Sequence, residues 1–159
     1  LVLVNTFPHY RKRLSLLASR IGARLIPRPI LAWGRDRIAP AVLFGRLREE
    51  SAVAAFRARM ATWQLDAGYR ARLRMVGRLD LRPRLGEIRQ PTLLIAGTED
   101  RIVDSLRQAR VMQQVLPRAT LETIEGGGHL ILPLASVDWI DYLTEAHTAA
   151  LERTGDPDA

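Results

Sequence analysis

The sequence PTLLIAGTED, residues 91–100, decides which fold this 159-residue chain adopts. Its apolar part, Thr92 to Ala96, is apolar on both faces, which is typical of a buried strand in a parallel sheet. The sequence EGGGH, residues 125–129, follows a second, more polar strand predicted at Ala119–Ile124, nearer a sheet edge. An acidic residue and a histidine therefore each follow the carboxyl end of a predicted strand.

Strands and helices alternate around these two sequences. Leu1–Asn5 is continuous and β-branched, so we predict a buried strand there. Asp104 is placed to cap a helix that Pro117 stops, and a last helix is predicted to fade at Gly155. The expected fold is α/β, with parallel strands joined by right-handed helical crossovers. Such sheets bind ligands at the carboxyl ends of their strands, so we expect the acid and the histidine at one rim.

Between the first and second strands, from Tyr10 to about Asp80, the pattern is helical with prolines as breaks, and no strand is evident. We therefore divide the chain into a core strand (1–8), a helical insertion (9–85), a C-terminal core part (86–154) and a tail (155–159) expected to be disordered. The apolar positions that recur at helical spacing include Leu14, Leu17, Ala18, Ile21 and Leu25 in the first helix and Val137, Ile140 and Leu143 in the last.

Asp100 and His129 are the candidate acid-base pair. Histidine has an ordinary pKa of about 6.5, so it is the usual general base near neutral pH. A carboxylate that accepts its other ring hydrogen holds one tautomer and stabilises the cation. Asp100 is the favoured partner; Glu99 and Asp104 are the alternatives, and we assign Asp104 to helix capping and Glu99 to solvent. The glycines at 126–128 allow positive φ angles that turn the histidine over the rim.

The other candidate side chains are weaker. We expect a packing or surface role for His9, with the mouth of the site as the alternative, and a solvated position for His147. The three histidines have no metal-ligand spacing, and no phosphate-binding loop is present, so we expect no metal and no cofactor. No Gly-x-Ser-x-Gly sequence occurs, and the serines lie in or at the start of predicted helices. We therefore expect no nucleophile in this chain.

Composition excludes several classes of protein. The chain has no cysteine, which excludes disulfides, thiolate metal sites and a cysteine nucleophile. No apolar run approaches the roughly 18 residues of a membrane span, and LVLV (1–4) is too short for a signal-peptide core. We expect a cytoplasmic protein without a membrane span. Because the chain starts at Leu in the middle of a strand, we expect it to be a piece of a longer protein.

The charge is distributed unevenly. Residues 1–90 hold eighteen arginines and one lysine against six acidic residues, a net charge of +13, whereas residues 91–159 carry −6. The simplest interpretation is a solvated arginine-rich surface, and the functional alternative is an anionic partner or substrate. Arg70, Arg74 and Arg78 form a stripe with little aromatic interleaving and no nucleic-acid motif, so we expect no nucleic-acid partner.

The residues described so far resemble the C-terminal half of the α/β-hydrolase superfamily. PTLLIAGTED with RIVD (91–104) resembles its seventh strand and acid loop, and LPRATLETIEGGGHLILPL (116–134) resembles its eighth strand and histidine loop. LVLVNTFP (1–8) resembles the sixth strand, after which the family inserts a lid. The resemblance implies that the helical insertion is this lid.

The resemblance also implies an activity. The family hydrolyses its substrates through an acyl-enzyme on serine, with Asp100 as the triad acid and His129 as base and later acid. It implies a small-molecule ester as substrate, with an anionic or carrier-bound ester as an open alternative. Dehalogenase, lactonase, carbon–carbon hydrolase, acyltransferase and non-catalytic receptor functions stay open, because the nucleophile elbow and the oxyanion-hole loop lie upstream. We expect the isolated chain to be inactive, and its oligomeric state is left undecided.

Overall fold

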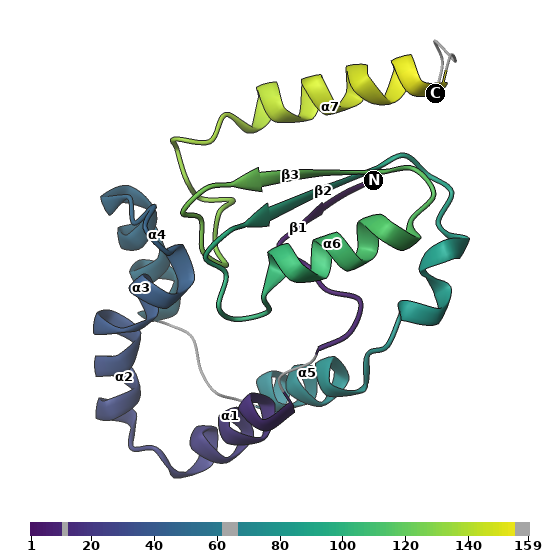
Figure 1. The fold of residues 1–159 in the computed structure, drawn as a ribbon. Helices are drawn as coiled ribbons and strands as arrows, with labels where there is room; N and C mark the ends of the chain where they lie inside the picture. Colours follow the sequence, from purple (N-terminus) through teal and green to yellow (C-terminus); the bar gives the residue numbers. More distant parts are fainter. Residues whose placement is uncertain (11–12, 62–66, 155–159) are drawn as a thin grey trace.

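A computed structural model describes residues 1–10, 13–61 and 67–154 of the chain. Its centre is a parallel three-stranded sheet of β1 (Val2–Val4), β2 (Thr92–Gly97) and β3 (Ala119–Ile124), in the order β1-β2-β3. The register places Ile95 opposite both Val4 and Glu122. The α/β class and the parallel crossovers predicted from the sequence are confirmed, and the carboxyl ends of all three strands lie at one rim (Figure 1).

The central strand β2 is buried along its whole length, as its sequence predicts. Leu93 and Ile95 contribute to a cluster on one face of the sheet, while Leu94 and Ala96 pack on the other face against α6 (Ser105–Val115). Each face of the sheet therefore has its own apolar cluster, and α6 packs on one face while α7 lies on the opposite side of the sheet (Figure 1).

The crossover helix α6 begins where the sequence predicts, but Asp104 does not cap it. Asp104 occupies the N-cap position with a left-handed backbone, φ 56 and ψ 51, and its side chain makes no capping hydrogen bond. N-cap residues that bond the first helical amides have extended backbones, so this conformation directs the carboxylate elsewhere. The helix ends at Val115, and Leu116 and Pro117 follow it.

The segment between β1 and β2 is helical, as predicted. Pro29 and Pro40 stand in the first turns of two of its helices, where a missing amide hydrogen costs nothing. The boundaries of this segment as a separate lid domain stay a prediction. Its elements are α1 (Arg13–Leu25), α2 (Arg28–Arg37), α3 (Ala39–Phe44), α4 (Glu50–Ala61), α5 (Ala67–Arg78) and the short 3-10 helix η1 (Arg82–Glu87).

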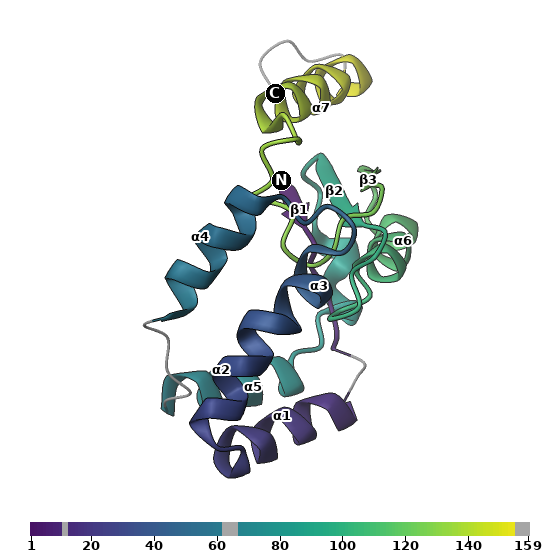
Figure 2. The ribbon, with the colours of Figure 1, turned by 90° about the vertical axis from the view of Figure 1, so that its left-hand side faces the viewer.

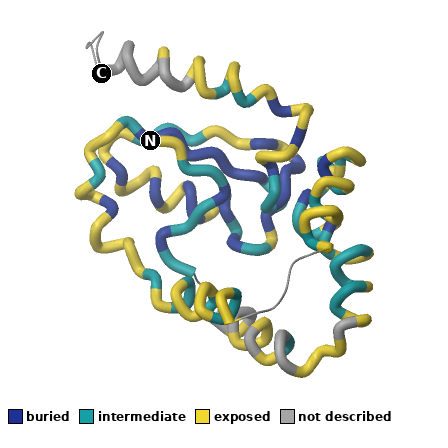
Figure 3. Tube along the Cα trace, turned by 180° about the vertical axis from the view of Figure 1, so that it is seen from behind, coloured by how far each residue is buried: buried dark blue, intermediate teal, exposed yellow. Residues whose placement is uncertain are grey.

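The helices of this segment differ in how they pack. Phe44 of α3 and Ala52 of α4 are buried in the cluster on the Leu93 face of the sheet. By contrast, α1, α2 and α5 lie away from the sheet (Figure 2), and the predicted apolar face of α1 is exposed, including Leu14, Leu17 and Ile21. The spacing of these residues predicts the helix correctly, but within the described ranges the face stays largely exposed even though α1 contacts α5 (Figure 3).

The last helix, α7 (Trp139–Thr154), has a different packed face from the one predicted. Ile140 is 77% exposed and Leu143 is also exposed, whereas Val137 is buried but precedes the helix. Trp139 and Tyr142 pack against the core instead, three residues apart on one side of the helix. The tail at 155–159, predicted to be disordered, lies outside the described residues.

The first strand is an edge strand, and the prediction of a buried strand is wrong, since no residue of β1 is buried and Leu3 and Val4 are only half-buried. Leu1 is 54% exposed and Val2 is 42% exposed. Among the described residues, β1 pairs with β2 only, so its other edge has unpaired backbone groups beside apolar side chains. Such an edge is a template for pairing with another chain.

We expect the isolated chain to self-associate through β1. Sedimentation velocity should show dimers or larger species that increase with concentration, and Val2→Lys should shift the distribution towards monomer because a charged edge disfavours pairing. Thr123→Lys adds the same charge on the exposed part of β3 and should have little effect. A wild-type chain that stays monomeric at every concentration would contradict this use of the β1 edge.

Candidate active site

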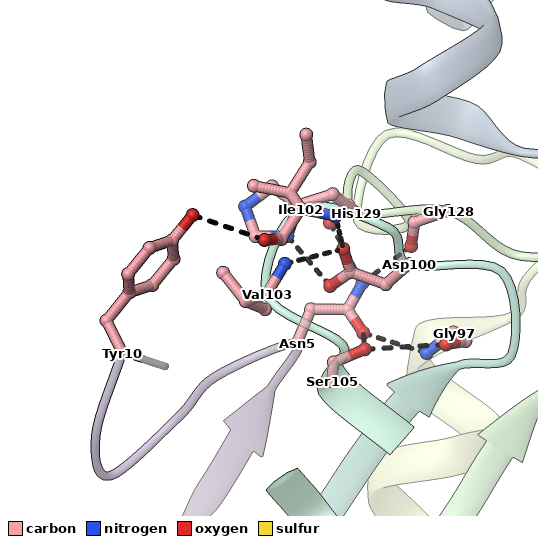
Figure 4. A network of polar contacts seen from close by, with 9 residues as sticks. All are labelled: Asn5, Tyr10, Gly97, Asp100, Ile102, Val103, Ser105, Gly128 and His129. Atoms are coloured by element: carbon pink, nitrogen blue, oxygen red, sulfur yellow. Dashed lines mark hydrogen bonds and ion pairs between the residues drawn. The ribbon is translucent and has the colours of Figure 1, made fainter. Parts of the chain in front are cut away.

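Asp100 and His129 lie side by side at the carboxyl rim of the sheet (Figure 4). Asp100 belongs to the acid loop, residues 98–104, which connects β2 to α6. His129 belongs to the histidine loop, residues 125–138, which connects β3 to α7. The structure brings together the two side chains that the sequence singled out, with 2.9 Å between Asp100 Oδ2 and His129 Nδ1. Their catalytic roles stay a prediction.

Three donors surround the Asp100 carboxylate, whose side chain is fully buried. Oδ1 accepts the backbone N–H groups of Ile102 (2.9 Å) and Val103 (3.2 Å), while Oδ2 faces the imidazole. Burial raises the pKa of Asp100, but the hydrogen bond and charge of His129 and the two backbone amides outweigh it. The pKa of Asp100 therefore lies below its ordinary value, and the group is an anion at neutral pH.

The His129 ring is oriented by this contact. An ionised carboxylate only accepts hydrogen bonds, so Nδ1 must carry a proton, and in the neutral ring the lone pair is then on Nε2. The His129 side chain is 28% exposed, and Nε2 has no hydrogen-bond partner in the described part of the chain. The arrangement presents a base to solvent with a buried anion behind it, which is how an acid-histidine pair accepts a proton.

The glycines of the histidine loop act mainly through close packing. Only Gly126 has a positive φ, 72°, so the prediction of positive angles at 126–128 is right at one position. A Cβ on Gly128 would lie 2.4 Å from the carbonyl oxygen of Leu43, closer than real Cβ contacts come. The loop needs glycine at 128 because another segment of backbone lies directly against it.

That neighbouring backbone is the clamp segment, residues 43–49, at the junction of α3 and α4. The N–H groups of Gly128 and Leu130 donate to the carbonyl oxygens of Phe44 (3.1 Å) and Leu43 (2.7 Å). In return, the N–H of Arg46 donates to the Gly126 carbonyl oxygen at 2.9 Å. The clamp segment therefore pairs with the histidine loop much as a strand would.

Side chains of the clamp segment add ion pairs to this contact. Arg46 lies 2.6 Å from Glu99 of the acid loop and 2.9 Å from Glu125 of the histidine loop. Glu99 therefore has a cationic partner, and the expectation that it faces solvent alone is wrong. Farther along, Glu49 accepts the N–H groups of Ala135 (2.7 Å) and Ser136 (3.0 Å) and the Ser136 hydroxyl. These bonds hold the pKa of Glu49 below its ordinary value.

Sequence reasoning missed Asn5, which lies beneath the pair. Its side chain is buried at the end of β1, where it contacts the backbone of the histidine loop and the N–H of Gly97, the residue directly before the acid loop. The available signal was an amide residue directly after the apolar sequence LVLV, at the same rim as the candidate acid and histidine. Ser105 is also part of this network: it is 1% exposed and its hydroxyl donates to Asn5 Oδ1, so it is not presented as a nucleophile.

The remaining candidates lie elsewhere. His9 packs near the start of η1, with Nδ1 3.2 Å from the Leu79 carbonyl oxygen and 3.9 Å from Asp80, and it lines a pocket of about 370 Å³ with Arg82, Gln108 and Val111. His147 is on α7, and its side chain lies outside the described residues.

Neither a metal-binding cluster nor a membrane-spanning helix is found among the described residues. No group of three or more histidine, aspartate or glutamate side chains in the described ranges is arranged to hold a metal ion. None of the helices that the structure describes is both long enough and apolar enough to cross a bilayer. A cytoplasmic location stays a prediction from the sequence.

The fold and this rim define a class of protein. A family model described as the alpha/beta hydrolase fold matches residues 29–135, which is more than half of the chain. The chain therefore belongs to the α/β-hydrolase fold family. Among curated proteins none matches.

Solved structures agree on the fold. A hydrolase from Pseudomonas aeruginosa PA01 is similar with a TM-score of 0.71 and 24% identity, over 95% of this chain and 54% of that one. The enol-lactonase from Burkholderia xenovorans LB400 has a TM-score of 0.69 and 21% identity, over 95% and 55%. An esterase from Exiguobacterium antarcticum has a TM-score of 0.70 and 20% identity, over 96% and 56%. The chain thus spans about half the length of these proteins.

The buried anion predicts a specific pH dependence of stability. The folded-state pKa of Asp100 lies below its unfolded value near 3.8. The contribution of Asp100 to the free energy of unfolding is therefore fully present above the unfolded pKa and is lost as the pH falls through the folded pKa. The difference in free energy of unfolding between wild type and Asp100→Asn should be constant above about pH 5 and should shrink below about pH 4. Urea unfolding followed by circular dichroism measures it.

An exposed carboxyl group provides the control for this experiment. Glu122→Gln on β3 should stay within about 0.5 kcal/mol of wild type over the same pH range. An Asp100→Asn effect that is the same at pH 3 and pH 7 would show that Asp100 is not held as an anion in the folded state.

Proposed function

We propose that the chain is the C-terminal part of a carboxylic ester hydrolase, in which Asp100 orients His129 and His129 moves the proton. The observation that carries the proposal is the 2.9 Å contact between a fully buried carboxylate and a partly exposed imidazole at the carboxyl rim of a parallel sheet. Membership of the hydrolase family and the half-length match to an esterase and an enol-lactonase support it. The nucleophilic serine and the oxyanion-hole donors would come from upstream.

The proposed reaction uses His129 Nε2, the ring nitrogen that does not face Asp100. His129 Nε2 takes the proton of the serine hydroxyl while the oxygen attacks the ester carbonyl carbon, and the Asp100 anion stabilises the imidazolium that forms. The Nε2 proton then passes to the departing alkoxide oxygen as the carbon–oxygen bond breaks, which leaves an acyl-serine. Water, deprotonated by the same nitrogen, releases the acid and restores the hydroxyl.

The same pair serves related reactions. Lactone hydrolysis uses identical proton transfers on a cyclic ester, and dehalogenase, carbon–carbon hydrolase and acyltransferase functions differ in nucleophile or acceptor. A non-catalytic receptor of the same fold would not need an oriented base. The identity of the upstream nucleophile separates most of these alternatives.

Activity assays test the proposal directly. The 159-residue chain should not hydrolyse p-nitrophenyl acetate above background, whereas a chain extended upstream through a Gly-x-Ser-x-Gly elbow should. In the extended chain, His129→Ala should lower kcat by about 10³-fold or more, because the base is lost. His9→Ala, which removes a histidine that contacts Leu79 and Asp80 instead of the pair, should leave kcat within a few-fold. Turnover by the 159-residue chain that His129→Ala abolishes would refute the need for an upstream half.

The basic helical segment supports a narrower proposal about the substrate. Arg74 and Arg78 are exposed on α5, and residues 1–90 carry a net charge of +13. We propose that this charge attracts an anionic substrate or an acidic carrier. In the extended chain, replacing Arg70 and Arg74 with Gln should raise KM for an anionic ester relative to a neutral ester of the same size. Equal changes in the two KM values would contradict the proposal.

A further inference from the structure

Asn5 ends β1, and its side chain lies between the acid loop and the histidine loop (Figure 4). Nδ2 donates to the carbonyl oxygens of Gly128 (2.9 Å) and His129 (2.8 Å). Oδ1 accepts the N–H of Gly97 (2.8 Å) and the hydroxyl of Ser105 (2.9 Å). A carboxamide has two donor hydrogens and two acceptor lone pairs, so all four positions are used.

The two donated bonds fix the backbone of His129. The Gly128 oxygen belongs to the peptide plane before the His129 Cα atom, and the His129 oxygen belongs to the plane after it. When both planes are held, the φ and ψ angles of His129 are held with them, and so is the direction in which its side chain leaves the chain. One amide group therefore fixes the position from which the His129 side chain extends.

The two accepted bonds fix the acid loop at both of its ends. Gly97 is the last residue of β2, directly before the loop, and Ser105 is the first residue of α6, directly after it. Asp100 lies between these anchors. The Ser105 hydroxyl also lies 3.4 Å from the Gly97 carbonyl oxygen, so the two ends of the loop meet at the Asn5 amide.

The backbone conformation of Asn5 also favours this position of its side chain. Its φ is 44°, in the left-handed region that asparagine tolerates better than most residues, and its N–H donates to the Ile95 carbonyl oxygen at 2.9 Å. The residue is 7% exposed, so water does not compete for these bonds. The side chain is aimed at the rim by a backbone conformation that few other residues adopt.

From these contacts we propose that Asn5 is a positioning residue that holds Asp100 and His129 at their hydrogen-bonding distance. It touches neither the reacting atoms nor the Asp100 carboxylate, and it acts through the backbone of the histidine loop and through Gly97 and Ser105, which flank the acid loop. The kinetic consequence rests on the proposed function, whereas the effect on the Asp100–His129 hydrogen bond does not.

Kinetics of the full-length protein test the first part. Asn5→Gly removes the amide and keeps a residue that adopts positive φ without strain. We expect kcat for p-nitrophenyl acetate to fall about 10- to 100-fold, since misplacing a catalytic group by about 1 Å has effects of this size, while KM changes less than about two-fold. Asn5→Asp keeps the shape but turns a carboxylate oxygen towards two carbonyl oxygens, and should lower kcat at least as much. Ser105→Ala removes one of the four bonds and should have a smaller effect.

A readout independent of turnover tests the second part. In ¹⁵N-histidine-labelled full-length protein, the His129 Nδ1 proton should appear far downfield and be protected from exchange, and Asp100→Asn should identify it by removing it. In Asn5→Gly and Asn5→Asp this signal should shift upfield and exchange faster. An unchanged signal in both variants overturns the inference, whatever the activity.

A control separates positioning from lost stability. Thr92→Val removes a buried hydroxyl, bonded to the Gln90 carbonyl oxygen at 3.0 Å, from the opposite end of β2. It should lower the melting temperature without changing kcat or the downfield signal. If wild type hydrolyses no ester but the signal responds to Asn5 as expected, the proposed function fails and the positioning role stands. If Asn5→Gly does not fold, Asn5→Asp and Ser105→Ala decide the question in the same two measurements.

Discussion

The buried carboxylate of Asp100 is the constraint on which the rim of the sheet depends. A charged group without solvent is tolerated only when donors replace the lost water, and here two backbone amides and the His129 ring do so. The backbone donors belong to residues two and three positions further on, so the acid loop must curl around its own side chain. The third donor lies on a different strand's loop. The backbone amides of the acid loop satisfy one carboxylate oxygen. The other oxygen is satisfied only because the acid loop and the histidine loop meet, which brings Asp100 and His129, 29 residues apart in sequence, to hydrogen-bonding distance.

That meeting is possible because the backbones at the rim touch. A Cβ on Gly97 would lie 2.4 Å from the Gly127 carbonyl oxygen, and the N–H of Glu99 donates to the same oxygen at 2.8 Å. Side chains at these positions would separate the loops by more than a hydrogen bond tolerates. The glycines at the rim and the Asn5 amide therefore both determine the distance between the acid loop and the histidine loop. The glycines allow the two loops to come this close, and the hydrogen bonds of the Asn5 amide hold them at this distance.

The sequence predicts the parts of this structure that depend on a single element. The buried β2, the limits of β3 and the helical segment follow from apolar periodicity and proline positions, and the order of acid and histidine after successive strands indicates a shared rim. The predictions that are wrong concern side chains whose contacts depend on residues elsewhere in the sequence. Asp104 adopts a left-handed backbone instead of capping, Glu99 finds Arg46 across the rim, and α7 packs Trp139 and Tyr142 instead of Ile140. Asn5 was missed for the same reason, since its four partners lie 92 to 124 residues away.

The helical segment divides into two physically different regions, although its sequence pattern is uniform. Residues 43–56 are joined to the rim: Phe44 and Ala52 are buried with Ile95, and the clamp segment bonds the backbone of the histidine loop and pairs with side chains of both loops. The helices α1, α2 and α5 instead lie away from the sheet and have exposed apolar residues such as Leu14 and Trp33. A movement of the first region would break ion pairs and backbone bonds to the histidine loop, so it would disturb the position of the His129 ring. A movement of the second region would break none of these contacts, so the acid-histidine geometry would be preserved.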